Sequence, residues 1–576
     1  MSESGSEPTH NIQVEWNVPV PMRDGTILRA DVYRPRTQGR FPVLLGRVGY
    51  KLRDWAMDYY TPTGEYYARR GYGVVWQNVR GTFASEGQFH PFRDDAWGTN
   101  QDGYDTVEWA AAQPWSNGKV GMLGISYSGL TQYLVAPSRP PHLQALFVQM
   151  GWGSNRAHMY RGGAHLLVLR PWWPMGMALM HVQDKPATPG LEAARASLEK
   201  AVQEANGWYG HLPLESLPPL AGFADWYFEQ LEHREDGPYW WPTDLSTMFR
   251  EVDVPILHWN GWFDHRLDAT LDSFVGIRAQ GRSERCRKSQ RLVIGPWCHF
   301  PPATWDLDFG PESVFDEYAW RLKWYDYWLK GIDNGVADEP AVRIFLMGAN
   351  RWIEMEDWPP SEATYRPFYL HEGSGINESS LNNGSLTVEP PGEDEPPDRF
   401  LYNPEEPIPS LRTFDDAGPK DYRPIEGRVL TYTSEVLEDD LTVVGPVKAV
   451  LYGMSSAPDT DWVVRLCDVW PDGRSMWVCE GILRARYRNS VEREELTIPG
   501  QLYRLEVDMW ATAQVFQAGH RLRVQVTSSD FPWYDRNLNT GGPFADEIRG
   551  QTAVNTVFHD TARPSHVVLP VLPQLR

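Results

Sequence analysis

The sequence predicts a chain of three parts: an α/β domain, a helical insertion within that domain, and an all-β sandwich at the C-terminus. In the first third, short apolar runs alternate with segments of helical length, which favours a mostly parallel sheet covered by helices. This alternation stops near residue 151 and resumes near residue 251. Beyond residue 345 the pattern changes to a period of two with many turn residues, which is typical of a sandwich.

Buried strands are expected where short apolar runs end in glycine or polar residues. The runs of the first part are residues 43–46, 73–79, 120–125 and 143–148, with helical segments at 64–70 and 104–112. Two more runs, 254–259 and 290–297, follow the insertion. A helix is expected over 314–330, because apolar side chains recur on one face and Gly331 follows as a stop.

The insertion shows no clear strand pattern. It is rich in Trp, Met and Pro and contains helical stretches such as 190–205. We therefore predict an α/β catalytic domain over 1–150 and 251–345, a helical cap over 151–250, and a sandwich over 346–576. Within the sandwich, Leu522, Val524 and Val526 alternate with polar residues, as in a strand with two different faces.

Composition and charge exclude several classes of protein. Hydrophobic residues make up 41% and charged residues 23%, as in ordinary globular proteins, and 27 Trp can supply both a core and an aromatic pocket. A net charge of −22 disfavours nucleic acid and anionic membranes as partners, because both would be repelled. No apolar stretch is long enough to span a bilayer.

The cysteines and the N-terminus indicate a cytoplasmic protein. Cys286, Cys298, Cys467 and Cys479 have no metal-like spacing and are expected to be reduced, with a Cys467–Cys479 bridge as the alternative. The first ten residues are polar and acidic and lack the basic and apolar regions of a secretory signal.

The sharpest chemical signal is Gly124-Ile-Ser-Tyr-Ser-Gly129, directly after an expected strand. A serine on a tight strand-to-helix turn exposes its hydroxyl at the carboxyl edge of a sheet, and small neighbours allow the backbones to approach. The fit to Gly-x-Ser-x-Gly is imperfect, because Ser128 stands where the second glycine is usual. Ser126 is the predicted nucleophile, and Ser128 is the alternative.

A serine nucleophile needs a base and a group that orients the base, in the chain order serine, acid, histidine. The run 254–259 leads into Asp264, and the run 290–297 leads into His299. Both residues therefore follow a strand at the edge where Ser126 is expected. We predict His299 as general base and Asp264 as its partner, and we interpret His258, inside a strand run, as a core histidine.

Acyl transfer also requires hydrogen-bond donors for the developing oxyanion. The amide of Tyr127 follows the nucleophile and is the first expected donor. The second should come from the loop after an earlier strand, and residues 46–50 form such a loop. The residues alone leave open whether Tyr50 would offer its amide or its phenol.

Several ordered blocks resemble the family of cocaine esterase, X-prolyl dipeptidyl-peptidases and α-amino-acid ester hydrolases. The blocks are Gly49-Tyr-Lys, Arg80-Gly-Thr-Phe-Ala-Ser-Glu-Gly87, Gly124-Ile-Ser-Tyr-Ser-Gly129, Gly261-Trp-Phe-Asp264, Gly295-Pro-Trp-Cys-His299 and Ser528-Ser-Asp-Phe-Pro-Trp-Tyr-Asp. The resemblance covers nearly the whole chain. It implies an α/β-hydrolase domain with a helical cap after the sixth strand, a C-terminal jelly roll, the catalytic residues Ser126, Asp264 and His299, and an oxyanion donor on the phenol of Tyr50.

The chain departs from the resemblance beside the acid. Cocaine esterase has a small residue and then a pocket-lining aromatic there, whereas this sequence has His265 and Arg266. Arg266 could contact an anionic or carbonyl-bearing substrate, or it could form a structural ion pair. The start of the cap also lacks the acidic pattern that holds an ammonium group in α-amino-acid ester hydrolases. Trp152, Trp172 and Trp173 are expected either to line the pocket or to pack in the cap.

These observations predict a serine hydrolase that cleaves a small-molecule carboxylic ester through an acyl-enzyme, without metal or other cofactor. An amidase or aminopeptidase of the X-prolyl or α-amino-acid ester hydrolase type is the alternative, because the same residues would serve it. A binding protein with an inactive hydrolase domain is a second alternative. A homodimer is a further expectation.

Overall fold

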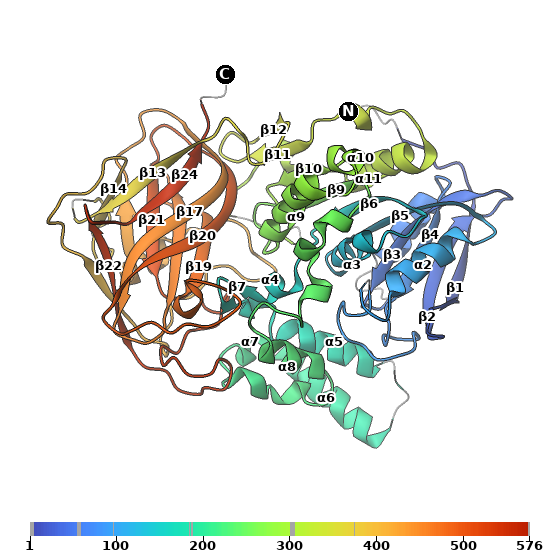
Figure 1. Ribbon diagram of the computed structural model, residues 1–576, viewed down its shortest axis with the longest axis horizontal. Coiled ribbons are helices and arrows are strands. Elements are labelled where there is room, and N and C mark those ends of the chain that lie inside the picture. The colour runs from blue at the N-terminus through green and yellow to red at the C-terminus, as the bar shows by residue number, and fades with distance from the viewer. Residues whose placement is uncertain are drawn as a thin grey trace.

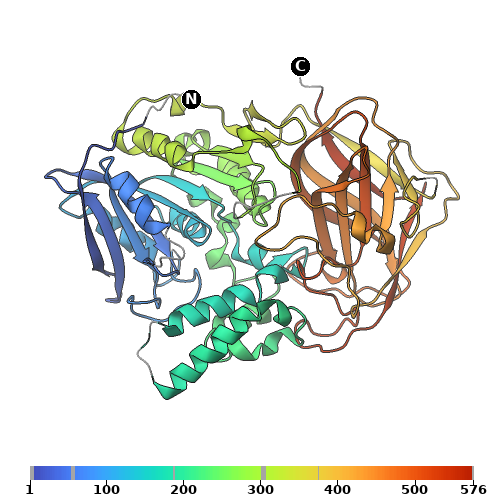
Figure 2. The same ribbon diagram turned by 180° about the vertical axis from the view of Figure 1, so that it is seen from behind.

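The computed structural model describes residues 5–53, 59–95, 97–183, 185, 188–299, 306–373 and 375–573. Three parts are arranged side by side: an α/β domain, a helical cap below it, and a β-sandwich at the other end of the molecule (Figure 1). The view from behind shows the cap bridging the lower edges of the other two parts (Figure 2). The predicted fold class is confirmed.

The α/β domain is built on one sheet of ten strands. Its strands are β1 (Ile12–Pro21), β2 (Ile27–Pro35), β3 (Phe41–Val48), β4 (Gly73–Asn78), β5 (Ser116–Ile125), β6 (Leu143–Gln149), β9 (Ile256–Gly261), β10 (Arg291–Gly295), β11 (Val342–Leu346) and β12 (Arg351–Met355). Their order is β1-β2-β4-β3-β5-β6-β9-β10-β11-β12. Strands β4 to β11 in this order are parallel, whereas β1, β2 and β12 pair antiparallel at the edges. Because β12 belongs to this sheet, the sheet extends past residue 345.

Helices cover both faces of the sheet, because the central strands are apolar on both sides. They are α1 (Tyr60–Ala68), α2 (Asp102–Ala111), α3 (Tyr127–Val135), α9 (Leu267–Gln280), α10 (Glu284–Lys288) and α11 (Glu317–Tyr325). Side chains of α2, α3 and α9 pack on one face, around Val120 and Ile256. Side chains of α1 and α11 pack on the other, around Leu123 and Leu257.

The cap comprises the elements between β6 and β9. They are α4 (Asn155–Met159), β7 (Tyr160–Arg161), β8 (Ala164–His165), α5 (Trp172–Gln183), α6 (Pro189–Gln203), α7 (Ala205–Trp208) and α8 (Asp225–Glu232). The hairpin β7–β8 was not predicted, because two-residue strands leave no periodic pattern. A Cβ on Gly162 in its turn would lie 1.9 Å from the carbonyl oxygen of Ile482, so glycine lets the cap dock closely on the sandwich.

The C-terminal part is a sandwich of twelve strands. They are β13 (Thr364–His371), β14 (Gly384–Thr387), β15 (Asp398–Tyr402), β16 (Leu430–Thr433), β17 (Leu441–Ser455), β18 (Asp461–Val469), β19 (Ser475–Arg484), β20 (Leu502–Phe516), β21 (Arg521–Thr527), β22 (Ala553–Asp560), β23 (Arg563–Pro564) and β24 (His566–Val571). The alternation in β21 separates an apolar core face from a second face that is also buried. On that second face, Arg523 forms a buried ion pair with Glu426, which lies in a short 3-10 helix (Arg423–Arg428).

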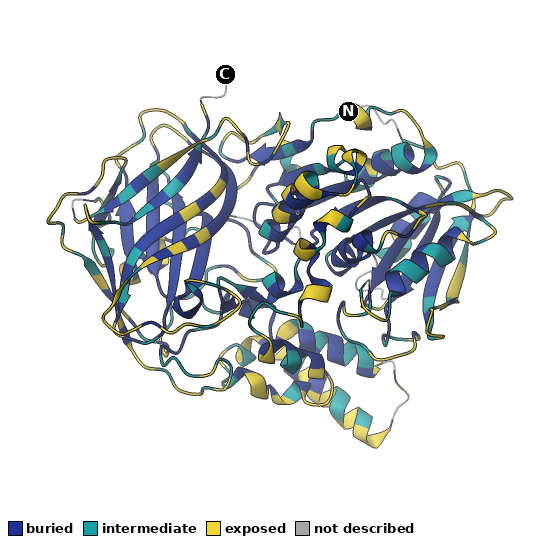
Figure 3. Ribbon diagram, viewed as in Figure 1, coloured by how far each residue is buried: buried dark blue, intermediate teal, exposed yellow. Residues whose placement is uncertain are grey.

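A shared apolar core joins the sandwich to the α/β domain. Trp262 and Phe263, just after β9, belong to the same cluster as Trp477 and Trp533 of the sandwich. The guanidinium of Arg412 lies between these two sandwich indoles, 4.0 and 4.1 Å from their ring centres. The strands in the middle of the α/β domain and of the sandwich are largely buried (Figure 3). The two parts are therefore packed as one unit rather than joined by a loose linker.

Two expectations about the whole chain can be compared with the structure. All four cysteines are buried free thiols, so the alternative of a Cys467–Cys479 bridge is wrong. Within the described residues, no helix combines the length and apolar character needed to cross a bilayer.

Candidate active site

Ser126 occupies the turn between β5 and α3. Its backbone has φ 61° and ψ −113°, a region that side-chain-bearing residues seldom adopt. The turn directs the chain from the sheet edge straight into a helix, so that the serine stands at the end of the strand. Such local strain persists only where the surrounding packing enforces it.

Small residues around the serine make this turn possible. A Cβ on Gly124 would lie 2.3 Å from the Cβ of Ser128, so glycine is required where strand and helix approach. A Cβ on Gly129 would lie 2.8 Å from the carbonyl oxygen of Gln149, at the end of β6. The displaced glycine of the motif therefore serves the packing of α3 against β6, while Ser128 donates to the carbonyl of Arg47 at 3.0 Å. Ser128 thus points away from the site.

Asp264 and His299 come from the loops after β9 and β10. Backbone bonds join these loops: the amide of Trp262 donates to Gly295 at 2.9 Å and that of Phe263 to Trp297 at 3.0 Å. A Cβ on Gly261 would lie 2.1 Å from the carbonyl oxygen of Trp297. This close approach fixes the spacing between the acid and the histidine.

The three predicted residues form a continuous chain of hydrogen bonds. Nε2 of His299 lies 2.9 Å from Oγ of Ser126, and its Nδ1 lies 2.7 Å from Oδ2 of Asp264. Asp264 is fully buried, and its other oxygen accepts from the backbone amide of Arg266 at 2.8 Å. With Nδ1 donating to the carboxylate, Nε2 of the neutral ring is an acceptor for the serine proton.

The surroundings favour the neutral form of His299. Burial lowers the pKa of His299, the nearby charge of Arg266 lowers it further, and Asp264 opposes both effects. The imidazole is therefore held ready to accept a proton, and the carboxylate is placed to stabilise the imidazolium that results. His258 lies apart from this chain, buried between Tyr133 and Gln290 as a core residue, as predicted.

Tyr50 and Tyr127 lie next to the serine. The indole nitrogen of Trp173 donates to the phenol oxygen of Tyr50 at 3.0 Å, which leaves the hydroxyl proton of Tyr50 to be donated elsewhere. Burial raises the pKa of Tyr50, so the phenol stays protonated. Tyr127 is the first residue of α3, where backbone amides are free to bind negative charge.

A cavity of about 1100 Å³ opens above Ser126. Its wall includes all three tryptophans for which the sequence left pocket lining and cap packing open: Trp152 is buried, Trp173 is half-buried and Trp172 is exposed. The sandwich contributes Phe414, whose ring centre lies 5.7 Å from that of His299 and 5.4 Å from that of Trp172. The α/β domain, the cap and the sandwich therefore all shape the cavity.

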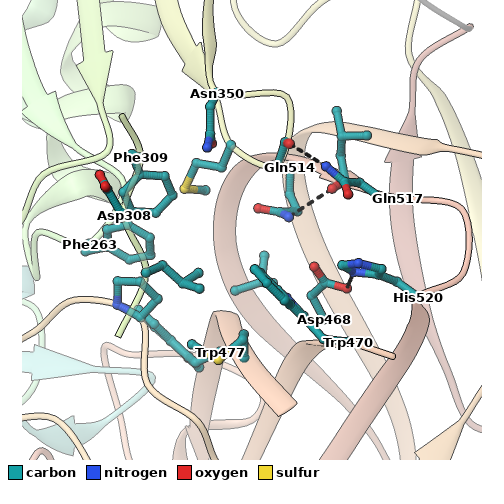
Figure 4. Close-up of a pocket in the computed structure, with 17 residues that line it drawn as sticks. Phe263, Asp308, Phe309, Asn350, Asp468, Trp470, Trp477, Gln514, Gln517 and His520 are labelled. Atoms are coloured by element: carbon teal, nitrogen blue, oxygen red, sulfur yellow. Dashed lines mark hydrogen bonds and ion pairs between the residues drawn. The ribbon is translucent and has the colours of Figure 1, made fainter. Parts of the chain in front are cut away.

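A second cavity lies between the α/β domain and the sandwich (Figure 4). Its volume is about 130 Å³, and it is lined by aromatic and polar side chains, among them the hydrogen-bonded pair Asp468 and His520, 2.8 Å apart. Ligand sites usually have volumes of roughly 300–1,000 Å³. The larger cavity is therefore the candidate substrate site.

Arg266 enters the site directly. Its Nη1 lies 2.8 Å from Oγ of Ser126 and 3.3 Å from Nε2 of His299, and its guanidinium stacks 3.7 Å from the ring centre of Trp152. No carboxylate of the described residues lies within 4.0 Å of its guanidinium nitrogens. The expected structural ion pair is therefore wrong, and Arg266 borders the substrate cavity instead.

Among the wall residues that were not predicted are Arg170 and Phe414. Arg170 stands between a short 3-10 helix (Leu167–Leu169) and α5, and Phe414 lies in a loop of the sandwich. Neither belongs to a local motif, because loops from distant parts of the chain bring them to the serine. Only the position of Arg170 next to the predicted Trp172 and Trp173 could have suggested it.

Asp264, His265 and His299 are residue types that can bind a metal, and they lie close together. Their ligand atoms lie within 4.8 Å of one another. However, Oδ2 of Asp264 and Nδ1 of His299 already share a hydrogen bond, and the neighbouring guanidinium of Arg266 disfavours another cation. The arrangement fits a carboxylate–histidine pair better than a metal centre.

The parallel sheet, the strained serine turn and the serine–histidine–aspartate chain together define an α/β-hydrolase. Residues 24–301 match the X-Pro dipeptidyl-peptidase (S15) family, and residues 334–568 match the C-terminal non-catalytic domain of X-Pro dipeptidyl-peptidases. The chain is 37% identical to cocaine esterase of Rhodococcus sp. (strain MB1 Bresler), over 98% of this chain and 99% of that one. The chain therefore belongs to this family and is a hydrolase that acts on ester or amide bonds.

Solved structures share the complete fold. An aminopeptidase from a marine sediment Thaumarchaeota archaeon superposes with a TM-score of 0.80 at 22% identity, covering 98% of this chain and 97% of that one. An α-amino acid ester hydrolase superposes with a TM-score of 0.77 at 24% identity, covering 99% and 98%. The complete fold of this chain is thus shared with a structure described as an aminopeptidase and with one described as an α-amino acid ester hydrolase.

Proposed function

We propose that this protein hydrolyses carboxylic esters through an acyl-enzyme formed on Ser126, with His299 as general base and Asp264 as the residue that orients it. The observation that carries the proposal is the unbroken chain of bonds from Ser126 Oγ through His299 to Asp264, at 2.9 and 2.7 Å. The order of these residues and the position of each at a strand end support it. The intact chain of bonds disfavours a binding protein with an inactive hydrolase domain.

In the first half of the reaction, Oγ of Ser126 attacks the substrate carbonyl while its proton passes to Nε2 of His299. The phenol of Tyr50 and the amide of Tyr127 donate hydrogen bonds to the oxyanion. His299 then gives its proton to the leaving alkoxide as the ester bond breaks. In the second half, water attacks the acyl-enzyme in the same way and releases the acid.

An ester is favoured over a peptide with a free N-terminus. X-prolyl dipeptides and α-amino-acid esters carry an ammonium group, whereas the cavity wall has Arg266 in contact with Ser126 and also includes the buried Arg170. Like charges in a poorly hydrated cavity repel strongly. The similarity to cocaine esterase also supports an ester substrate.

The site as proposed requires no metal, so dialysis against a chelator should leave the rate of ester hydrolysis unchanged.

Ser126→Ala should lower kcat/KM for a short aryl ester by about 10⁴-fold or more, because it removes the nucleophile. The matched control is Ser128→Ala, which should change kcat/KM by less than about tenfold, since Ser128 bonds the backbone of Arg47. Initial rates under the same conditions give both values. A Ser128→Ala protein that is inactive beside an active Ser126→Ala protein would move the nucleophile to Ser128.

Tyr50→Phe should lower kcat by about 10²- to 10³-fold with little change in KM, because the lost hydrogen bond acts mainly in the transition state. Trp173→Phe is the matched control, since it removes the bond to the Tyr50 oxygen but keeps an aromatic ring. Its effect should be smaller than that of Tyr50→Phe. An unchanged kcat in Tyr50→Phe would assign the oxyanion to other donors.

The pH dependence should reflect the lowered pKa of His299. With a neutral ester, kcat/KM should rise with pH along a limb whose midpoint lies below 6.5, because burial and Arg266 keep the imidazole unprotonated to lower pH. Arg266→Leu should move this limb to higher pH by removing one of the two causes. A wild-type midpoint above 6.5, or one that does not move in the variant, would contradict this electrostatic account.

A further inference from the structure

Two buried arginines border the large cavity without a carboxylate of the described residues at ion-pair distance. Arg170 is 1% exposed and Arg266 is 6% exposed. Within the ranges that the structure describes, neither guanidinium lies within 4.0 Å of a carboxylate. They come from different parts of the chain, Arg170 from the cap and Arg266 from the loop between β9 and α9, and yet both charges act on the same phenol, that of Tyr50.

Other buried arginines of the chain are held by protein oxygens. Those paired with carboxylates are Arg47, Arg80, Arg321, Arg412, Arg465, Arg484, Arg486 and Arg523. Arg156 donates instead to the backbone carbonyls of Arg234 and Val491. Against this pattern, Arg170 and Arg266 stand out, and both face the cavity above the nucleophile.

The two arginine side chains make few hydrogen bonds, and none of the acceptors that the structure describes for them is a carboxylate or a carbonyl oxygen. Nη2 of Arg170 lies 2.6 Å from the sulfur of Met159, while its Nε and Nη1 have no acceptor among the described residues. Nη1 of Arg266 contacts Ser126 and His299, and its Nε likewise has no acceptor in the described part of the chain. Each guanidinium lies over an indole, Arg266 over Trp152 at 3.7 Å and Arg170 over Trp173 at the longer distance of 5.5 Å. The close contact with Trp152 helps to hold Arg266 in place before any ligand arrives.

Such an arrangement is unfavourable in the free protein. Burial lowers the pKa of both guanidinium groups, which expresses the cost of a desolvated positive charge. The neighbouring ring of His158 adds no further positive charge, because burial and the two arginines hold its pKa far below the ordinary value and keep it neutral. Glu317 reaches the cavity but is bonded to Gln149 and lies 3.6 Å from Arg321. Asp264 offsets part of the positive charge through space, but with two arginines beside one buried carboxylate the site keeps an excess positive charge that an entering anion would balance.

We propose that the preferred substrates are esters that carry a carboxylate close to the scissile carbonyl, with Arg266 and Arg170 as the carboxylate-binding residues. This inference rests on the proposed function of Ser126. A carboxylate that enters the cavity would offset these desolvated charges and accept hydrogen bonds from the guanidinium groups, and charge-assisted bonds of this kind are the strong ones. Because Arg266 also contacts Ser126, a bound carboxylate would place the ester beside the nucleophile.

The test compares each anionic ester with its neutral methyl ester. Mono(4-nitrophenyl) terephthalate and its methyl ester place the charge on the acid side of the scissile bond, and 4-acetoxybenzoate and its methyl ester place it on the alcohol side. Each kcat/KM is divided by the rate constant of alkaline hydrolysis of the same ester. The wild-type protein should prefer the anionic member of at least one pair by on the order of tenfold or more.

Arg266→Gln and Arg170→Met should each reduce this preference by on the order of tenfold, whatever they do to the absolute rate on the neutral ester. Arg93→Gln is the matched control, because Arg93 is exposed, lies outside the large cavity and faces Glu229 at 3.8 Å. It should leave the preference within about twofold. A preference that survives in both cavity variants, or that falls equally in the control, would overturn the assignment.

Two further measurements do not depend on turnover. Terephthalate should bind the Ser126→Ala protein by calorimetry, and adding Arg266→Gln should weaken this binding by on the order of tenfold. Arg170→Met should keep or raise the melting temperature, because replacing an unpaired buried charge by an apolar side chain is neutral or stabilising. A large fall in melting temperature would mean that Arg170 serves the fold.

The outcomes separate the two proposals. If neutral esters are hydrolysed in a Ser126-dependent manner but neither pair shows an anionic preference, the carboxylate site is wrong and the esterase assignment stands. If no ester is hydrolysed and terephthalate does not bind, both proposals fail. If terephthalate binds through Arg266 without ester hydrolysis, the carboxylate site stands and the esterase assignment fails.

Discussion

The geometry of the site depends on a ladder of backbone hydrogen bonds that continues past the ends of the parallel strands. The amide of Ser126 donates to Gln149, that of Met150 to Trp259, and that of Trp262 to Gly295, at 3.0, 2.8 and 2.9 Å. These bonds tie the turn after β5 to the loops after β6, β9 and β10. Since parallel strands end at one edge of the sheet, residues far apart in sequence meet there and are held by the backbone itself. The side-chain bonds of the serine, the histidine and the aspartate are a consequence of this backbone arrangement.

The other two parts of the chain give this edge its surroundings. The cap supplies Trp173, which orients the phenol of Tyr50, and the sandwich supplies Phe414 beside His299. A sandwich held by buried ion pairs can present such a loop rigidly: Arg412 and Arg465 share the carboxylates of Glu480 and Asp530. The sandwich matches a domain described as non-catalytic, which means that it supplies no reacting group. Its packing nevertheless shapes the substrate cavity.

Much of this was predictable from sequence, for definite reasons. Ser126, Asp264 and His299 each follow an apolar run, and a local pattern of that kind fixes both a strand and the edge at which it ends. The phenol of Tyr50 came only from the family resemblance, because spacing cannot distinguish an amide from a side chain. Arg170 and Phe414 escaped because tertiary packing alone brings them to the serine. A substrate contact of Arg266 was one of two alternatives that the sequence left open. The sequence could not show that no carboxylate of the described residues packs against the guanidinium, because that depends on the tertiary packing around it.

The most direct test of the central claim is to react the wild-type protein with a fluorophosphonate and to locate the adduct by peptide mass spectrometry. The reagent reports which hydroxyl is activated by a neighbouring base, whatever the natural substrate is. The bond of 2.9 Å between Ser126 and His299 predicts a single adduct on Ser126 that disappears in His299→Ala. An adduct on Ser128, or labelling of Ser126 that persists without His299, would contradict the account.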